Sequence, residues 1–345
     1  MTSEEPVLVY VHPDHRLHNP SEPHRFGGVL LPPAETAARA DRILSALAQL
    51  EAVDVVCPPP VDEQDLLLVH EPEYLEFLRM AHDRWRAATG APADGEAVAY
   101  IRPIPGLPGR PPTHVDAQLG IYSNDVDPIL EGTWPAALSA AASAVAAAGA
   151  IHDGGKAAYA ICRPPGHHAA PATFGGYCYL NNTALAAAWL ASRGARVAIV
   201  DVDTHHGNGT QAVFWSRGDV LTISIHGDPE VHFPYFSGFP EERGDGSGSG
   251  ANLNLPLPSG SGWPAYRPAL DEAVEAVGSF GAEFLVVALG VDTHVTDGVL
   301  ALTAQDYPLL GEALRTGLPT VIIQEGGYGP GVLEAAVPAV LAAFV

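Results

Sequence analysis

Six continuous runs of apolar residues, rich in valine and isoleucine, recur along the chain and restrict its fold more than any other feature. They cover residues 7–12, 157–164, 196–203, 220–227, 284–292 and 320–327. Strands that are covered on both faces have this composition. Helix-like stretches stand between them, such as 182–194, closed by Gly194, and 303–317, with Thr303 as the expected N-cap and Gly317 beyond the end. The alternation predicts a mostly parallel α/β sheet.

The chain contains no internal repeat and no low-complexity linker, so residues 1–345 are expected to form one domain. Residues 90–135 break the alternation, because they are rich in Pro and Gly and have little periodicity. A loop of that length is functional or disordered, and we expect an insertion that shapes a site or a partner surface. Residues 228–262 form a second long loop. The Ala-rich run 137–151 is predicted to be a packed helix that is too short to span a bilayer.

Acidic residues outnumber basic residues by 40 to 17, which gives a formal net charge of −23. Such a surface repels nucleic acid and anionic lipid and attracts cations, although acidity also serves solubility alone. The three cysteines, Cys57, Cys162 and Cys178, have no CxxC spacing, so we expect reduced thiols. The acidic N-terminus does not resemble a signal peptide. These features predict a cytoplasmic protein with no nucleic-acid or membrane partner.

Polar clusters follow four of the predicted strands, at the point where each strand ends. In open α/β sheets, ligands bind outside the carboxyl ends of the strands. Four such loops together are stronger evidence for a site than any one of them. The clusters are "RPPGHHA" (163–169), "DVDTHHG" (201–207), "GVDTH" (290–294) and "EGGYG" (325–329).

The second cluster places two carboxylates and an imidazole at the end of a buried strand. Asp201 and Asp203 share a face of the strand, and His205 follows where the strand turns into its loop. Burying these charges is costly unless a group of opposite charge shares the site. A nitrogen and oxygen ligand set suits Zn²⁺, and three protein ligands leave the open position of a catalytic site. Asp203, His205 and Asp292 are therefore the predicted ligands, with a metal-free polar cluster as the alternative.

Two adjacent histidines, His167 and His168, end the first cluster. Such a pair beside a metal-bound water can act as general base and general acid. Asp201 and Asn208 are candidates to fix the two tautomers through the far ring nitrogens. Tyr328 can donate a hydrogen bond to a developing oxyanion. The alternatives are a surface histidine pair and a tyrosine that packs on the core.

Five motifs occur in the order and approximate spacing of the zinc-dependent histone deacetylase superfamily: "RPPGHHA", "FGGYCYLNN", "DVDTHHGNGT", "LGVDT" and "EGGYG". More narrowly, the chain resembles the bacterial acetylpolyamine amidohydrolase branch, from "HPDHRLHNP" (12–20) to the C-terminal helix. The resemblance implies an arginase/deacetylase-like, three-layer α/β fold with a central, mostly parallel, eight-stranded sheet. It also implies a zinc-dependent hydrolase that removes acetyl groups from small acetylated amines, such as acetylpolyamines, and releases acetate.

The resemblance implies roles for individual residues as well. One Zn²⁺ per chain would be held by Asp203, His205 and Asp292. His167, His168 and Tyr328 would be catalytic, with Asp201 and Asn208 behind the histidines; the second position is Asp in many relatives. The remaining implied sites are a structural K⁺ site at Asp201 and Ser224, a second monovalent-cation site near Phe214, Arg217 and Val220, and a substrate tunnel at Gly176, Tyr177 and Phe233.

The insertion at 90–135 resembles a loop that, in the polyamine branch, helps to form a dimer and narrows the tunnel mouth. We therefore expect a homodimer and a small cationic substrate. Asp116 is the preferred candidate to meet a distal ammonium group, with Asp94 and Glu96 as alternatives. A deacetylase of acetyl-lysine in proteins or peptides is the second interpretation, and a non-catalytic binder of acetylated ligands is a third. An arginase-type site with two manganese ions needs more ligands than the chain supplies, since His294 is the only extra candidate.

Overall fold

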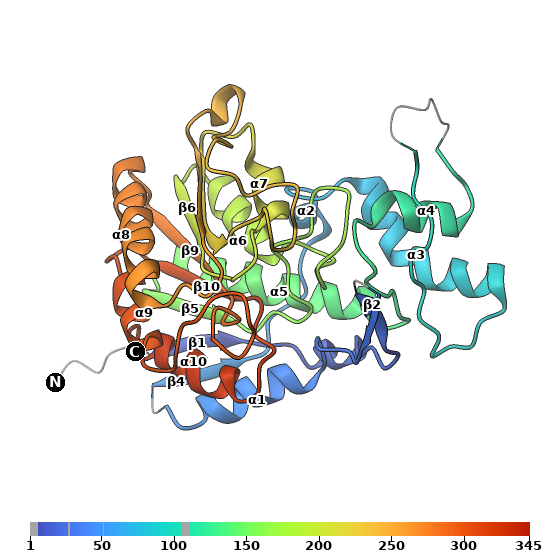
Figure 1. Cartoon of the computed structure of the whole chain (residues 1–345), viewed down its shortest axis with the longest axis horizontal. Helices are drawn as coiled ribbons and strands as arrows, with labels where there is room; N and C mark the ends of the chain where they lie inside the picture. The colour runs from blue at the N-terminus through green and yellow to red at the C-terminus, as the bar shows by residue number, and fades with distance from the viewer. Residues whose placement is uncertain (1–5, 27, 51, 105–110) are drawn as a thin grey trace.

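The computed structural model describes residues 6–26, 28–50, 52–104 and 111–345. In this part of the chain, eight parallel strands form one sheet in the order β4-β1-β5-β10-β9-β6-β7-β8 (Figure 1). The predicted parallel sheet is confirmed, and the six predicted runs each supply one strand. The strands are β1 (Val7–Tyr10), β4 (Val53–Val56), β5 (Ala157–Ala160), β6 (Val197–Asp201), β7 (Val220–Gly227), β8 (Asn252–Leu257), β9 (Phe284–Leu289) and β10 (Thr320–Gln324).

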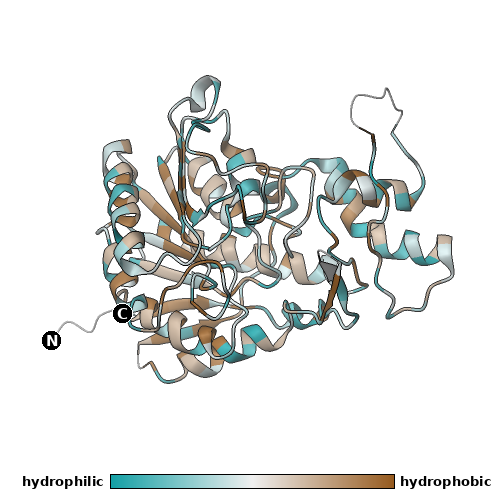
Figure 2. Ribbon diagram, viewed as in Figure 1, coloured by the Kyte–Doolittle hydropathy of each residue, from teal (hydrophilic) through white to brown (hydrophobic). Residues whose placement is uncertain are grey.

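Helices cover both faces of the sheet and bury a separate hydrophobic cluster on each. One cluster includes residues of α3, α5 and α6, and the other includes residues of α1, α8, α9 and α10. Alternate strand residues enter alternate clusters: on β10, Val321 and Ile323 enter the first cluster and Ile322 enters the second. Figure 2 shows the resulting pattern, with apolar strands inside and polar segments on the outer helices. The α-helices are α1 (Ala38–Leu47), α2 (Glu63–Leu66), α3 (Pro72–Thr89), α4 (Val115–Tyr122), α5 (Thr133–His152), α6 (Asn182–Ala191), α7 (Asn208–Phe214), α8 (Trp263–Phe280), α9 (Tyr307–Leu314) and α10 (Val332–Leu341).

Several predicted boundaries were wrong. Helix α9 begins at Tyr307 rather than after Thr303, because Pro308 occupies the first turn and the Asp306 carboxylate accepts hydrogen bonds from the Thr303 N–H and hydroxyl. The segment 228–262 was predicted to be a loop, but it contains β8, which pairs with the edge of the sheet along β7. Helix α5, at 20 residues, is longer than predicted, and its length and composition would allow it to cross a membrane. In this structure it is mostly buried and packs on the sheet beside α6.

The segment 90–135 was predicted to be an irregular loop, but part of it is helical. Helix α4 lies within it, and the His114 side chain accepts a hydrogen bond from the Asp116 N–H at the start of that helix. Residue Gly120 packs directly on the backbone of Ile101, where a Cβ would lie 1.9 Å from the carbonyl oxygen. Together with α3, residues 90–104 and α4 project from the body of the molecule as an arm (Figure 1). A short antiparallel hairpin of β2 (His24–Phe26) and β3 (Val29–Leu31) lies outside the main sheet.

The strand order explains how the polar clusters meet. Strands β5, β10, β9 and β6 are consecutive neighbours in the centre of the sheet, and all four run in the same direction. Each of the four clusters follows one of these strands. Their loops therefore leave the sheet side by side at its carboxyl edge.

Candidate active site

A cavity of about 430 Å³ opens at this edge of the sheet. It receives residues from all four clusters and from three further segments, at 125, 176–177 and 233–235. Apolar and aromatic walls surround a small number of polar groups, as in most small-molecule sites. The lining residues are Asp125, Pro165, His167, His168, Gly176, Tyr177, Asp203, His205, Phe233, Tyr235, Asp292, Gly326 and Tyr328.

The three predicted zinc ligands lie together at the base of this cavity. One ligand atom each from Asp203, His205 and Asp292 lies within 4.8 Å of the other two. The Nδ1 atom of His205 is 3.3 Å from Asp203 Oδ1 and 3.2 Å from Asp292 Oδ2. Asp292 Oδ2 is buried and accepts no hydrogen bond from the described residues. An imidazole nitrogen and two carboxylates, one with a free buried oxygen, fit a divalent transition metal such as Zn²⁺.

The electrostatics of this group also fit a cation. Burial and the neighbouring Asp203 raise the pKa of Asp292 to about 6, so the two carboxylates repel each other in the absence of positive charge. Burial would lower the pKa of His205, but its close contacts with both carboxylates raise that pKa to about 10. The group therefore favours a positive charge between the two carboxylates, which a bound cation would supply. Gly326 leaves space here, since a Cβ would lie 2.4 Å from Asp292 Oδ2 and 2.5 Å from Asp203 Oδ2.

A second group, His167, Cys178 and Glu325, also brings ligand-type atoms within 4.8 Å of one another. Both Glu325 oxygens already accept hydrogen bonds, from the Gly166 and His167 N–H groups and from the Thr183 hydroxyl. Burial raises the pKa of the Cys178 thiol well above its ordinary value, which disfavours the thiolate that metals bind. This group therefore does not resemble a metal site.

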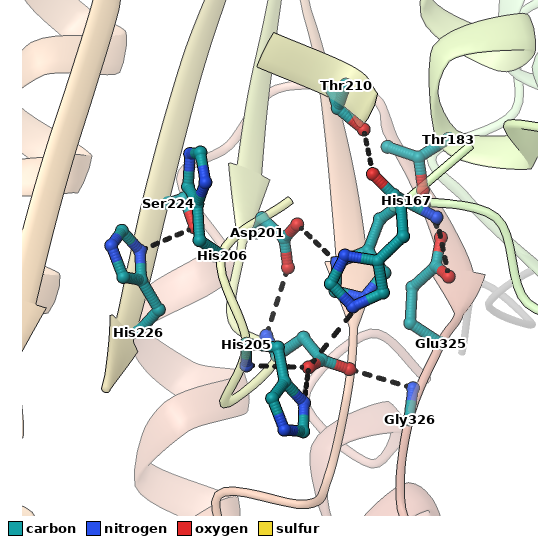
Figure 3. A network of polar contacts seen from close by, with 12 residues as sticks. His167, Thr183, Asp201, His205, His206, Thr210, Ser224, His226, Glu325 and Gly326 are labelled. Carbon is teal, nitrogen blue, oxygen red and sulfur yellow. Dashed lines mark hydrogen bonds and ion pairs between the residues drawn. The ribbon is translucent and has the colours of Figure 1, made fainter. Parts of the chain in front are cut away.

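The two histidines have different partners, and their pKa values shift in opposite directions. His167 Nδ1 lies 2.9 Å from Asp201 Oδ2, and His168 Nδ1 lies 2.8 Å from Asn208 Oδ1 (Figure 3 shows the first pair). Burial opposes a charge on His167, but Asp203 and Asp201 raise its pKa well above the ordinary value. Burial and the charges of His167 and His205 lower the pKa of His168 well below it. These shifts favour an imidazolium at His167 and a neutral ring at His168, whose Nε2 can then accept a proton.

Tyr328 is held on three sides at the cavity wall. Its backbone N–H donates to Asp297 Oδ1 at 3.0 Å, the Arg39 guanidinium lies 4.5 Å above its ring, and the Tyr177 ring centre is 5.5 Å away. Burial raises the pKa of the Tyr328 phenol well above its ordinary value. The hydroxyl therefore stays protonated and remains a donor. Arg39 and Asp297 were not recognised in the sequence, because both lie outside the motif clusters.

The two predicted monovalent-cation sites lie at different places along β6 and β7: Asp201 and Ser224 lie beside His167, whereas Val220 lies at the start of β7. Asp201 pairs in register with Ser224, and Asp201 Oδ1 accepts the Asp203 N–H at 3.0 Å. The Ser224 hydroxyl is 2.8 Å from His226 Nδ1. Farther along, the Arg217 guanidinium lies 5.1 Å above the Phe214 ring and binds Asp219, next to Val220 at the start of β7. Binding of K⁺ at either place stays a prediction.

The predicted tunnel residues line the cavity, but the acidic residues that were predicted to meet an ammonium group do not. Gly176, Tyr177 and Phe233 all line the cavity. Asp116 is not among the lining residues, and its carboxylate accepts the Tyr100 hydroxyl on the arm at 3.2 Å. Glu96 binds the Ser21 and Glu22 N–H groups instead. The acidic residue of the insertion that does line the cavity is Asp125, which the sequence analysis missed because nothing in its neighbourhood distinguishes it from other loop carboxylates.

His294, the extra candidate for a two-metal site, points elsewhere. Its Nδ1 atom lies 2.8 Å from the Thr296 hydroxyl, and the residue does not line the cavity. The described residues at the base of the cavity thus supply one set of three ligands rather than two.

Comparison with known proteins gives a consistent result. Residues 33–344 match the model of the histone deacetylase domain. The chain is 44% identical over 321 residues to an acetylpolyamine amidohydrolase of Mycoplana ramosa, covering 92% of this chain and 93% of that protein. A Pseudomonas aeruginosa acetylpolyamine amidohydrolase is 44% identical over 322 residues, with 91% and 92% covered. The crystal structure of an acetylpolyamine aminohydrolase from Burkholderia pseudomallei matches with a TM-score of 0.89 and 40% identity, over 98% of each chain, which confirms the predicted fold class.

Proposed function

Because the chain belongs to the histone deacetylase family, we propose that it is a zinc-dependent amidohydrolase that removes acetyl groups from small acetylated amines, such as acetylpolyamines. One observation carries this proposal. The three metal-ligand side chains, the two histidines and Tyr328 all meet in one cavity, although they come from four separate loops. The names of the relatives support the substrate class.

The residues fit zinc, and the ion would be held by Asp203, His205 and Asp292. When bound there, zinc polarises an amide carbonyl and lowers the pKa of a water molecule to about 7. The groups of this chain supply the remaining steps. His168 Nε2 takes a proton from the attacking water, because Nδ1 faces Asn208 and the ring is neutral. The charge of His167 stabilises the negative charge that develops on the acetyl group.

Tyr328 donates its phenolic proton in a hydrogen bond to the same developing oxyanion. The C–N bond then breaks, and the proton held at His168 Nε2 passes to the leaving nitrogen. The products are acetate and a free amine. Each role follows from the charge state and position of the side chain in the cavity.

The cavity walls support a thin, cationic substrate. The rings of Tyr177 and Phe233 line the cavity, and Phe233 lies 5.0 Å from the His168 ring, edge to face. These aromatic walls suit a methylene chain. Asp125 lies in the same lining with a half-buried side chain, and its carboxylate can attract a distal ammonium group. The formal net charge of −23 favours the approach of cations in general.

A turnover comparison tests the substrate class. Zinc-loaded protein is expected to hydrolyse acetylputrescine, acetylcadaverine and acetylspermidine with a kcat/KM at least ~10-fold above that for an acetyl-lysine peptide, a difference of about 1.4 kcal/mol. Release of acetate is the measurement. Faster turnover of the peptide would favour a protein deacetylase instead, and saturable binding without acetate release would favour a non-catalytic binder.

Asp125→Asn provides a matched variant for the same comparison. The substitution keeps the size of the side chain and removes its charge. KM for the acetylated diamines should rise by roughly 2- to 5-fold, as a partly exposed ion pair is worth ~0.2–1 kcal/mol. A neutral N-alkylacetamide should be unaffected. An equal change for the charged and the neutral substrate would remove Asp125 from ammonium recognition.

We also infer a homodimer formed through the arm. Tyr100, Ile101, Ile104 and Ile121 of this segment have exposed fractions of 76%, 54%, 69% and 40%. Apolar side chains clustered on a surface favour contact with another protein surface. Sedimentation of the full chain is expected to show a dimer, and Ile104→Glu is expected to shift it toward monomer. A wild-type monomer at micromolar concentration would contradict this inference. A structural K⁺ and a cytoplasmic location stay predictions.

A further inference from the structure

A buried carboxylate without an obvious role in the reaction lies beside the histidine pair. Glu325 follows directly after β10, and its side chain is fully buried. Its Oε2 atom accepts the Gly166 N–H at 2.6 Å and the His167 N–H at 3.1 Å, and its Oε1 atom accepts the Thr183 hydroxyl at 2.6 Å. Figure 3 shows Glu325 between Thr183 and His167. Burying a carboxylate is costly, and three charge-assisted hydrogen bonds offset that cost and hold the side chain in one position.

The bonds of Glu325 join two loops that carry different parts of the reaction. The side chain binds the backbone of the loop that presents His167 and His168. The backbone of the same residue begins the loop that presents Tyr328: the Glu325 N–H donates to Leu289 O at 2.9 Å, and the Glu325 carbonyl accepts from Arg39 Nη2 at 2.8 Å. The next residue, Gly326, donates its N–H to Asp203 Oδ2 at 2.9 Å.

The peptide of His167 is also held from its other side. Its carbonyl accepts the Thr210 N–H at 3.1 Å, which lies on α7. Pro164 and Pro165, which precede Gly166, have no N–H groups. Glu325 therefore accepts the first two N–H groups that follow the prolines. Among the described residues, no other side chain accepts either of them.

We propose that Glu325 is a positioning residue, which fixes the His167 and His168 backbone against the Tyr328 loop so that base and oxyanion donor keep their separation. This inference rests on the proposed function. The role needs an acceptor of the right shape and does not need the negative charge. A misplacement of reacting groups by ~1 Å can cost about 10²-fold in rate.

Two substitutions separate shape from charge. Glu325→Gln keeps an oxygen that can accept from Gly166 and His167, and its amide can donate to the Thr183 hydroxyl. Glu325→Ala removes all three bonds. We expect Glu325→Ala to lower kcat by about 10²-fold with KM within ~3-fold of wild type, and Glu325→Gln to keep kcat within ~5-fold. Thr320→Val, a buried threonine at the opposite end of β10, is the control and should retain wild-type kcat.

Hydrogen exchange supplies a measurement that does not depend on turnover. In a peptide covering 163–168, the exchangeable amides after the prolines are those of Gly166, His167 and His168. Glu325→Ala is expected to lose protection at Gly166 and His167, and Glu325→Gln is expected to keep it. Because this readout needs no substrate, a failure of the proposed function would leave it intact and would instead appear as absent turnover in wild type.

Three outcomes would overturn the inference: wild-type kcat in Glu325→Ala, unchanged exchange at Gly166 and His167 in that variant, or equal loss of kcat in the Gln and Ala variants. The last result would show that the charge matters and the position does not. If Glu325→Ala does not fold, Thr183→Val removes a single bond to the carboxylate. It should lower kcat by a few fold without changing KM, while the prediction for Glu325→Gln still applies.

Discussion

Tyr328→Phe is expected to lower kcat of the zinc-loaded enzyme by ~10²–10³ and to leave its zinc content at the wild-type value, because one oxyanion donor is typically worth that much in rate. The substitution removes a single hydroxyl. The ring keeps its contacts with the Arg39 guanidinium and Tyr177, and the backbone N–H keeps its bond to Asp297. Steady-state kinetics and elemental analysis of the purified variant measure the two quantities.

Tyr235→Phe is the matched control, because Tyr235 lines the same cavity with a half-exposed side chain and no role in the reaction is expected for its hydroxyl. Its kcat should stay within ~3-fold of wild type, as expected for a partly exposed surface group. Unchanged turnover in Tyr328→Phe would remove the phenol from the mechanism. Loss of zinc in that variant would show that the substitution disturbs the metal site.

Asp292→Asn is expected to lower both zinc occupancy and turnover, with a zinc affinity reduced by at least ~10²-fold. Loss of a group that only supports a ligand already costs ~10–100-fold, and Asp292 is proposed to bind the metal directly. Asparagine keeps the size of the side chain and its bond from the Thr204 N–H, which Asp292 Oδ1 accepts at 2.9 Å. It removes the negative charge from Oδ2, the buried oxygen that faces His205 at 3.2 Å.

Asp125→Asn serves as the control for this experiment, since it removes a carboxylate from the cavity wall rather than from its base. That variant should retain one zinc per chain. Full zinc occupancy in Asp292→Asn would contradict its assignment as a ligand. A chelator titration of both variants gives the affinities, and added zinc should restore part of the turnover of Asp292→Asn if weakened binding is the cause.

The residues that meet in the cavity could be picked out in the sequence because each cluster follows the end of a strand. Asp203 and Asp292 each come directly after an apolar run, and such runs are readable without a structure. The neighbouring positions of β6 and β9 in the sheet could not be read in this way, because strand order depends on packing between distant segments. Convergence of the clusters was therefore an inference from general sheet geometry until the fold was known.

The contacts of Glu325 could not be predicted from the sequence. Glu325 belongs to the motif "EGGYG", but its bonds to Gly166 and His167 join positions 158 to 159 residues apart. Composition and periodicity contain no information about such pairs. Asp116 was named and Asp125 was missed for a related reason: the Pro- and Gly-rich segment around them has too little periodicity to show which carboxylate faces the cavity.

The position of the arm suggests how enzymes of this fold can come to accept different amine substrates. The proposed catalytic and metal-binding residues lie on the loops after β5, β6, β9 and β10, whereas Asp125 belongs to a separate stretch of chain that joins the arm to α5. Arg102 of the arm donates to the Asp125 carbonyl, so changes in the arm reach that carboxylate without touching the bond-breaking groups. We therefore expect that evolutionary substitutions in this stretch, or its replacement by the same stretch of a relative, change which amines bind. The proposed catalytic residues would stay the same.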